Sequence, residues 1–535
     1  MAGVFQAYQQ RYGNPAAQGN AAQVQSVPAP VGGWNARDSL ADMQPADAVT
    51  LINMFPTVSS VVLRGGYQKW ATGLPGQVNS LFAYSGGGTS KLFAATANGS
   101  FYDVSSAGAV GAPAVTGLTN GSWEYSNIST PGGSYISCVN GADDLRLYDG
   151  TNWTTINSGS SPIAITGVAT NVLNNITLFK NRLWFIEKNT LRAWYLPTQA
   201  VGGAAQMLDL SSVAKYGGHL IDLDTWTLDA GYGADDNLVF ITSEGEVIAY
   251  RGTDPASAET WALMGVWKLG SPIGHRALLK WAGDLLVLTF DGLLPLASAL
   301  QSSRLDPRVA LSDKIQGAIA SATTLYAGSH ESIGWQVYYN AKTNAVWINV
   351  PVATDMQQQY VMNTITTSWC QFTGWGANVW ETFNDDPYFG GNGYVGLAWT
   401  TDGVDAYADN GANISTQIIQ AFNYYGSRGV KKYFTRARPS IFTDGTPTIN
   451  VGMNVDFDLS NTVGALSFAP ISYALWDSAV WDVGVWGQGL VVNNIWLGVT
   501  GIGYCGAIQM QTASMGTQIQ WAATDVVYQL GWAGV

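Results

Sequence analysis

Residues 235–252, DDNLVFITSEGEVIAYRG, contain the pattern that decides the fold. Two short runs rich in β-branched and aromatic residues, 238–242 and 246–251, flank the polar turn Ser243-Glu244-Gly245. Because the glycine can adopt a positive φ, this pattern predicts a β-hairpin. The pattern recurs at intervals of 43 to 55 residues, beginning at Lys91, Ser134, Lys180, Asp235, Gly283, Gly334 and Asp386.

A hairpin repeated at this interval is typical of the blades of a β-propeller, each of about four strands. A single blade leaves both faces of its sheet uncovered, so blades stack radially to bury them. We therefore predict an all-β protein with a propeller of about seven blades over residues 67–411. The alternative is a long all-β chain in which hairpins recur only because such chains contain many.

The segments on either side of the repeat differ from it in composition. Residues 1–33 are rich in Ala, Gln, Gly and Pro, which predicts an extended N-terminal arm that either docks on a neighbouring subunit or stays free. We expect removal of this arm to spare folding. Residues 412–535 lose the repeat but alternate as antiparallel strands do, which predicts a second, platform-like β domain.

Two helices are expected outside the regular strands. In the lead-in segment 34–66, a short helix should follow Pro45, with Ala48, Leu51 and Ile52 on one face, before a strand at 58–63. Residues 312–325 should form a helix inserted between blades. Ser312 is placed to cap it, and apolar residues recur at helical spacing at Ile315, Ile319 and Ala322.

Composition excludes several classes of protein. The 535 residues carry a net charge of −13, which argues against a general nucleic-acid binder. The three cysteines and three histidines are scattered and fit neither a disulfide framework nor a zinc site. No apolar stretch is long enough to span a membrane, and the N-terminus lacks the pattern of a signal peptide.

Motifs for catalysis are also missing. The sequence has no G-x-S-x-G elbow, no P-loop and no repeated Asp-box of the sialidase type. The acidic residues Asp402, Asp405 and Asp409 do not have the spacing of an EF-hand loop. We therefore expect no enzymatic activity, no cofactor and no bound metal.

A basic cluster in this acidic chain is the one candidate site. Five cations fall within eleven residues: Arg428, Lys431, Lys432, Arg436 and Arg438. Regular strand alternation would place Lys432, Arg436 and Arg438 on one side with Phe434 among them. The cluster is interpreted as an ion-pair seam between subunits or a solvated strand face, with contact to DNA phosphates as the other alternative.

The stretch 43–76, MQPADAVTLINMFPTVSSVVLRGGYQKWATGLPG, resembles the start of tail nozzle (tail tubular) proteins from short-tailed bacteriophages. In that family an N-F-P-like turn leads a strand into an R-G-G corner before the propeller. Residues 249–276 and 281–300 are similar to the family's link between two blades and to its next blade. Near the C-terminus, LWDSAVWDVGVWG (475–487) resembles the family's Trp-Asp cluster through Trp476, Trp481 and Trp486. The positions that carry the likeness at the corner are Asn53, Phe55, Pro56, Arg64 and Gly65.

The resemblance implies a structural subunit of the virion tail, assembled in the bacterial cytoplasm. Such subunits form a ring, expected to be a hexamer, under the adaptor ring, and the nozzle also meets tail fibres or spikes. Double-stranded DNA would pass through the ring transiently during ejection. The alternative function is a monomeric propeller that acts as an adhesin or glycan-binding module.

Overall fold

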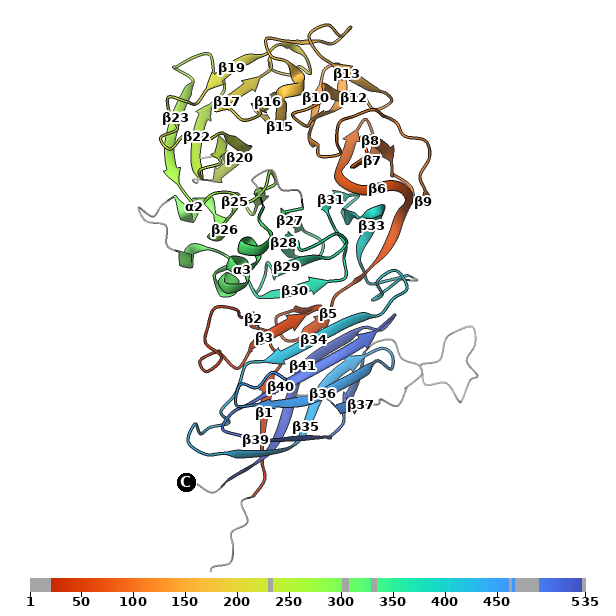
Figure 1. Cartoon of the computed structure of the whole chain (residues 1–535), viewed down its shortest axis with the longest axis vertical. Coiled ribbons are helices and arrows are strands. Elements are labelled where there is room, and N and C mark those ends of the chain that lie inside the picture. The colour runs from red at the N-terminus through yellow and green to blue at the C-terminus, as the bar shows by residue number, and fades with distance from the viewer. Residues whose placement is uncertain are drawn as a thin grey trace, which may run out of the picture.

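The computed structural model describes residues 21–229, 234–300, 307–328, 334–403, 405–460, 464–466 and 490–531. Within this part of the chain, seven small antiparallel blades surround a central axis, and a second body of strands lies below them (Figure 1). Each predicted hairpin falls in a different blade, so the prediction of a propeller of about seven blades is confirmed.

The blades follow one another along the chain, each beginning with its innermost strand. Blade 1 contains the second half of β6 (Gly66–Gly86), β7 (Thr89–Thr96) and β8 (Ser100–Asp103). Blade 2 contains β10 (Glu124–Thr130), β11 (Gly133–Val139), β12 (Leu145–Tyr148) and β13 (Trp153–Ile156). Blade 3 contains β15 (Leu173–Phe179), β16 (Arg182–Glu187), β17 (Arg192–Tyr195) and β19 (Gln206–Asp209).

The remaining blades repeat this order. Blade 4 contains β20 (Leu220–Asp229), β21 (Ala234–Thr242), β22 (Glu246–Gly252) and β23 (Trp261–Lys268). Blade 5 contains β24 (Leu278–Trp281), β25 (Asp284–Thr289) and β26 (Gly292–Pro295). Blade 6 contains β27 (Gln336–Asn340), β28 (Ala345–Pro351), β29 (Gln357–Asn363) and β30 (Trp369–Thr373). Blade 7 contains β31 (Val379–Phe383), β32 (Asp386–Gly390), β33 (Asn392–Thr400) and the first half of β6.

Strand β6 closes the propeller because it belongs to both the first and the last blade. Its residues 66–77 pair with β33 of the last blade, and residues 78–86 pair with β7 of the first. Short strands accompany the blades: β9 (Gly108–Ala109) pairs with β6, and β14 (Ile165–Thr166) pairs with β18 (Gly203–Ala204). A 3-10 turn at Thr170–Val172 precedes blade 3.

The helical insertion lies between blades 5 and 6. It comprises α2 (Leu296–Ala299), 3-10 turns at Pro307–Val309 and Asp313–Ile315, and α3 (Gln316–Tyr326). Ile315, Ile319 and Ala322 are buried, as their spacing predicts. The prediction that Ser312 caps the helix is wrong, because its hydroxyl accepts a hydrogen bond from the backbone N–H of Leu293 instead (3.0 Å).

The platform consists of two sheets that enclose a shared core. One sheet contains β1 (Gln23–Pro28), β4 (Met54–Pro56), β5 (Val61–Leu63), β35 (Lys432–Thr443), β38 (Val491–Asn494), β39 (Leu497–Gly503) and β41 (Ile519–Leu530). The other contains β2 (Gly33–Trp34), β3 (Asp47–Ile52), β34 (Ile414–Gln420), β36 (Thr448–Val455), β37 (Gly464–Leu466) and β40 (Gly506–Ser514). Strand β3 also bridges to β30, so this second sheet continues into blade 6.

The N-terminal segment therefore builds part of the platform. The helix expected after Pro45 is wrong: residues 47–52 form strand β3, which lies between β30 and β34. Pairing on both sides outweighs a weak helical pattern in a segment that contains Val49, Thr50 and Ile52. Residues 23–28 of the predicted arm are extended, but as strand β1 they pair with β41 of the same chain, so this part is neither free nor docked on a neighbour. Trp476, Trp481 and Trp486 lie outside the described residues.

Candidate functional site

The basic cluster lies on and just before strand β35, where a β-bulge divides it. Phe434 is opposite Tyr528 of β41, and Arg436 is opposite Val527. Between these two pairs β35 advances by two residues while β41 advances by one. The bulge reverses the alternation. Lys432 and Phe434 are buried, whereas Arg436 is exposed. The prediction that Lys432, Arg436 and Arg438 share one side is therefore wrong.

The five cations have different partners. Lys432 is fully buried, donates to the backbone oxygens of Ser427 and Tyr504, and has a pKa lowered by burial. Arg438 pairs with Asp525 (2.6 Å) and stacks over Trp496. The exposed pair Arg428–Asp42 is 3.3 Å long. Lys431 lies over the ring of Tyr504, and Arg436 has no carboxylate partner among the described residues.

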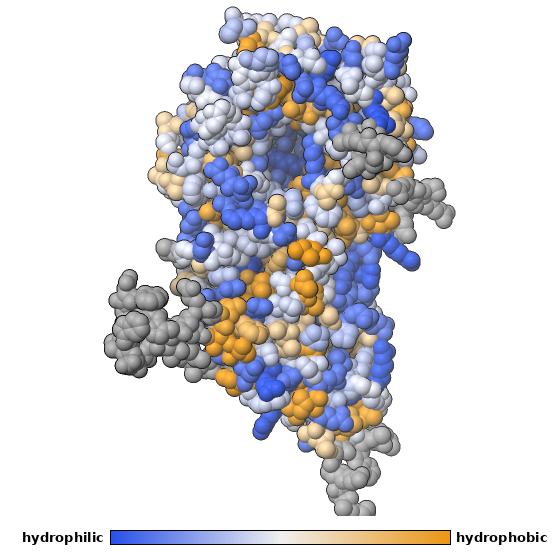
Figure 2. Space-filling view, turned by 180° about the vertical axis from the view of Figure 1, so that it is seen from behind, coloured by the Kyte–Doolittle hydropathy of each residue, from blue (hydrophilic) through white to orange (hydrophobic). Residues whose placement is uncertain are grey.

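Around Arg436 and Arg438, the outer face of the β1–β41–β35 sheet exposes large apolar side chains. Tyr433 and Ile502 are directly opposite each other on β35 and β39, and are 47% and 55% exposed. Val24 of β1 is opposite Val527, which in turn is opposite Arg436. We call this surface the platform patch, made of Val24, Tyr433, Arg436, Arg438, Val492, Trp496 and Ile502. Figure 2 shows hydrophobic side chains gathered on the platform, whereas the opening at the propeller centre is hydrophilic.

The residues that carry the family resemblance lie at the junction of propeller and platform. The fully buried Arg64 guanidinium forms a bidentate ion pair with Asp409 (2.6 and 2.8 Å) and also donates to the backbone oxygen of Thr373. It stacks over Trp375, and its Nε donates to the side-chain oxygen of Asn53 (2.9 Å). At Gly65 any Cβ would come within 2.6 Å of the Trp399 backbone, so the corner requires glycine.

Phe55 completes this junction from the platform side. Its ring lies against Phe372 of β30 and edge-on to Trp399 of β33. The N–H donors of the Arg64 guanidinium are all engaged within this junction, which leaves none for a ligand. The role of the junction is to fix the two domains to each other.

The central cavity of the propeller has a volume of about 430 Å³. Its wall is formed by the innermost strand of each blade, so polar side chains two residues apart point into it. Two of its carboxylates have cationic partners: Glu124 pairs with Arg276 (2.9 Å) and Asp224 pairs with Lys280 (2.7 Å).

Two further carboxyl groups of the cavity lack such partners among the described residues. Burial raises the pKa of Glu381 to about 7, although the Tyr125 hydroxyl (2.9 Å) and the Thr382 N–H donate to it. Burial also raises the pKa of Asp222 well above its ordinary value, and the neighbouring Asp224 adds to this effect. A pKa of about 7 means that the Glu381 carboxyl changes its charge close to neutral pH.

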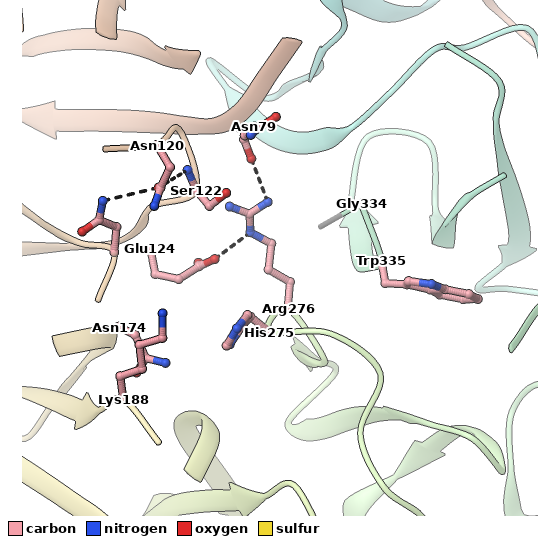
Figure 3. Close-up of a pocket in the computed structure, with 11 residues that line it drawn as sticks. Asn79, Asn120, Ser122, Glu124, Asn174, Lys188, His275, Arg276, Gly334 and Trp335 are labelled. Carbon is pink, nitrogen blue, oxygen red and sulfur yellow. Dashed lines mark hydrogen bonds and ion pairs between the residues drawn. The ribbon is translucent and has the colours of Figure 1, made fainter. Parts of the chain in front are cut away.

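Arg276 separates this cavity from a smaller pocket of about 280 Å³ at one end of the axis (Figure 3). Its guanidinium donates to Glu124, to Ser80 Oγ (2.9 Å) and to the backbone oxygens of Asn79 and Trp123 (both 3.2 Å). The contacts connect blade 5 to blades 1 and 2. Strand β15 and loops of several blades supply the other polar side chains of the pocket: Asn120, Ser122, Asn140, Asn174, Lys188 and His275.

The described residues contain no group of three or more His, Cys, Asp or Glu side chains that could hold a metal ion. Asp409 is committed to Arg64, while Asp402 is exposed. Among the described residues, no helix is long and apolar enough to cross a membrane.

Sequence reasoning missed the cavity residues. A signal for some of them exists, because in blades 2, 3 and 4 the innermost strand precedes the predicted hairpin and carries polar residues at positions i and i+2. Asp222 and Asp224, Asn175 and Thr177, and Glu124 and Ser126 follow this rule.

No protein-family model matches the sequence, and no curated protein matches it significantly. Among solved structures, the chain is similar to BBS1N in complex with ARL6DN, at 8% identity and a TM-score of 0.39, over 62% of this chain and 95% of that one. It is also similar to the WD40 β-propeller domain of Doa1, at 11% identity and a TM-score of 0.39, over 63% and 98%. The β-propeller domain of Myceliophteria thermophila Cps50 (Swd1) matches at 14% identity and a TM-score of 0.38, over 61% and 100%.

Proposed function

We propose that this protein is a non-enzymatic subunit of the tail nozzle of a short-tailed bacteriophage. Copies assemble into a ring, expected to be a hexamer, that forms the distal part of the conduit for genome ejection. Its partners are other copies of itself, the adaptor ring protein and tail fibres or spikes. It resides in the virion tail after assembly in the bacterial cytoplasm.

The observation that carries this proposal is the junction around Arg64. Asn53, Phe55, Arg64 and Gly65 come from the stretch that resembles the nozzle family, and they join in one cluster between the propeller and the platform. A motif that fixes one domain on another suits a subunit whose parts must stay aligned in a ring.

The platform patch supports self-association. Monomers seldom expose contiguous apolar surface of this kind, and interface cores are enriched in aromatic residues and arginine. Tyr433, Trp496, Arg436 and Arg438 bring both residue types together on one sheet face. We propose this patch as a contact between neighbouring copies.

The charge distribution supports passive passage of DNA. Residues 67–411 contain 28 of the 37 acidic and 16 of the 24 Lys and Arg residues, so this segment carries −12 of the net charge of −13. A conduit gains nothing from strong phosphate binding, since every contact must break as DNA moves. Acidic walls repel phosphates over about one Debye length.

The experiment is electron microscopy and light-scattering mass of the purified full-length protein. We expect rings, and we expect Tyr433→Ser with Ile502→Ser to shift the population towards monomer. The matched control is Leu263→Ser with Met264→Ser, which removes two similarly exposed apolar side chains from β23 of the propeller. If the protein is a monomer at all concentrations, the ring proposal is wrong and a monomeric binding module is favoured. Tight, salt-sensitive retention of duplex DNA would overturn passive passage.

A further inference from the structure

A groove of about 510 Å³, here called the junction groove, lies between the platform and the last two blades of the propeller. Phe55, Val62 and Leu63 line it from β4 and β5, and Leu397 and Trp399 line it from β33. Of these apolar side chains, Val62, Leu397 and Trp399 are only partly buried, so an occupant of the groove can reach them. The volume lies within the range of ligand-binding clefts.

The rim of the junction groove is acidic. Asp386 pairs with Lys342 (2.5 Å), whereas Asp402 is exposed and forms no salt bridge within the part of the chain that the structure describes. Asp385 and Asp405 flank these two carboxylates in the sequence, so acidic groups outnumber the one lysine of the lining. A partner that places a cation beside aromatic side chains would complement this surface.

Residues 1–20 of the chain have that composition. They lie outside the described residues and contain no Asp or Glu. Aromatic residues and arginine are the types most enriched in interface cores and hot spots. Four of them fall within the stretch 5–12, FQAYQQRY: Phe5, Tyr8, Arg11 and Tyr12.

This arm is long enough to reach the junction groove of another copy. Gln23 at the start of β1 is opposite Tyr528, whereas Gln518, just before β41, lines the groove. The strand between residues 518 and 528 spans about 33 Å. Twenty extended residues span up to about 66 Å, which covers this distance and leaves length for the step to a neighbour.

We propose that residues 5–12 of one copy occupy the junction groove of the next copy in the ring. The aromatic side chains pack on the apolar floor, and Arg11 pairs with Asp402. Each chain carries a net charge of −13, so copies repel one another, and a cation of one copy on a carboxylate of the next offsets part of this repulsion. This inference rests on the ring of the proposed function and names the segment that links its subunits.

The first test is a disulfide between the two surfaces in the full chain. Gln10→Cys is combined with Thr401→Cys, at an exposed position that lines the groove. The three native cysteines are buried. After mild oxidation, non-reducing electrophoresis should show a ladder of linked chains. Tyr216→Cys in place of Thr401→Cys is the matched control, because Tyr216 is 61% exposed but does not line the groove, and it should give no ladder.

The second test exchanges the two charges. Arg11→Glu and Asp402→Lys should each raise the protein concentration needed for half-assembly about fivefold, the size expected when one exposed ion pair is lost. The double variant should assemble like wild type. Arg11→Glu with Glu244→Lys is the control and should not recover, because Glu244 lies at an exposed hairpin turn outside the groove.

Failure of this inference can be told apart from failure of the ring. If rings form but no ladder of linked chains appears, or if the double charge exchange assembles no better than either single variant, the docking is wrong and the ring proposal stands. A disulfide formed only within one chain also overturns docking on a neighbour. If the wild type stays monomeric, the proposed function itself is wrong.

Discussion

At the residue scale, the polar groups that matter most are buried in pairs and networks. Arg64 illustrates this, because its guanidinium contacts three other segments of the chain, at Asn53, Thr373 and Asp409, besides the backbone oxygen of the adjacent Gly65. Removal of one member of a buried ion pair leaves the other buried without that partner. The resulting loss of folding stability is far larger than the net contribution of the intact pair.

The first prediction is that Arg64→Met lowers the free energy of unfolding by about 3–5 kcal/mol, measured by denaturant titration. The loss arises because the Asp409 carboxylate remains in place without the guanidinium, while the Asn53 side-chain oxygen keeps only the Thr373 N–H as a donor. Arg37→Met is the control: Arg37 also contacts two carboxylates, Asp38 and Asp313, but is 43% exposed. That change should cost less than about 1 kcal/mol. Equal effects of the two substitutions would contradict the role given to Arg64.

The second residue-scale prediction concerns the pH dependence of stability. The folded-state pKa of Glu381 is about 7, against an ordinary value of 4.5, so the folded state holds a proton that the unfolded chain releases. Stability therefore falls as pH rises from 4.5 to 7, by up to about 3 kcal/mol from this group.

Glu381→Gln keeps an acceptor for Tyr125 and the Thr382 N–H but cannot ionise. Its melting temperature should rise relative to wild type on moving from pH 5 to pH 8. Glu244→Gln, at an exposed hairpin turn, should show no such trend. A constant difference between Glu381→Gln and wild type across this range would rule out the buried carboxyl as the cause.

At the scale of elements, edge strand β1 connects the two ends of the chain. Residues 23–28 pair with residues 523–528, Val27 and Ala29 are buried, and the Pro28 oxygen accepts from Gln420. The composition of residues 1–33 predicts that their loss spares folding. The pairing argues otherwise, because removal would uncover the edge of β41 as a template for aggregation.

We predict that deletion of residues 1–20 leaves thermal stability unchanged, whereas deletion of residues 1–33 lowers it and promotes aggregation. Differential scanning calorimetry with light scattering measures both effects. Ring assembly of the shorter deletion tests whether residues 1–20 dock on a neighbour. If the 1–33 deletion melts like wild type, the strand has no structural role.

At the scale of the whole molecule, the repeat could be predicted because hairpins are local: Ser243-Glu244-Gly245 and its flanking runs are complete within 18 residues. Tertiary pairing could not be predicted in the same way. Strand β3 is specified by neighbours more than 300 residues away, at Gln371 and Ile418. The bulge at Thr435 is likewise a product of pairing with β41, and it separates Lys432 from Arg436.

The candidate site could be predicted only in part. The basic residues are visible in the sequence, but their faces depend on the bulge. The cavity and the pocket depend on strands of several blades meeting at one axis, so residues as distant as Asn79 and Arg276 become neighbours. The composition of the sequence does not predict which distant residues become neighbours at the axis.

Strand β6 sets a time constraint on folding during synthesis. Its residues 66–77 pair with residues 392–400, so the propeller cannot close until those residues have been synthesised. At about 5–20 residues per second, the ribosome needs roughly 15 to 60 seconds to make the intervening chain. For that period residues 66–77 lack their strand partner, and a newly made chain is most exposed to pairing with the wrong neighbour. Slower translation would lengthen this vulnerable interval without changing the finished structure.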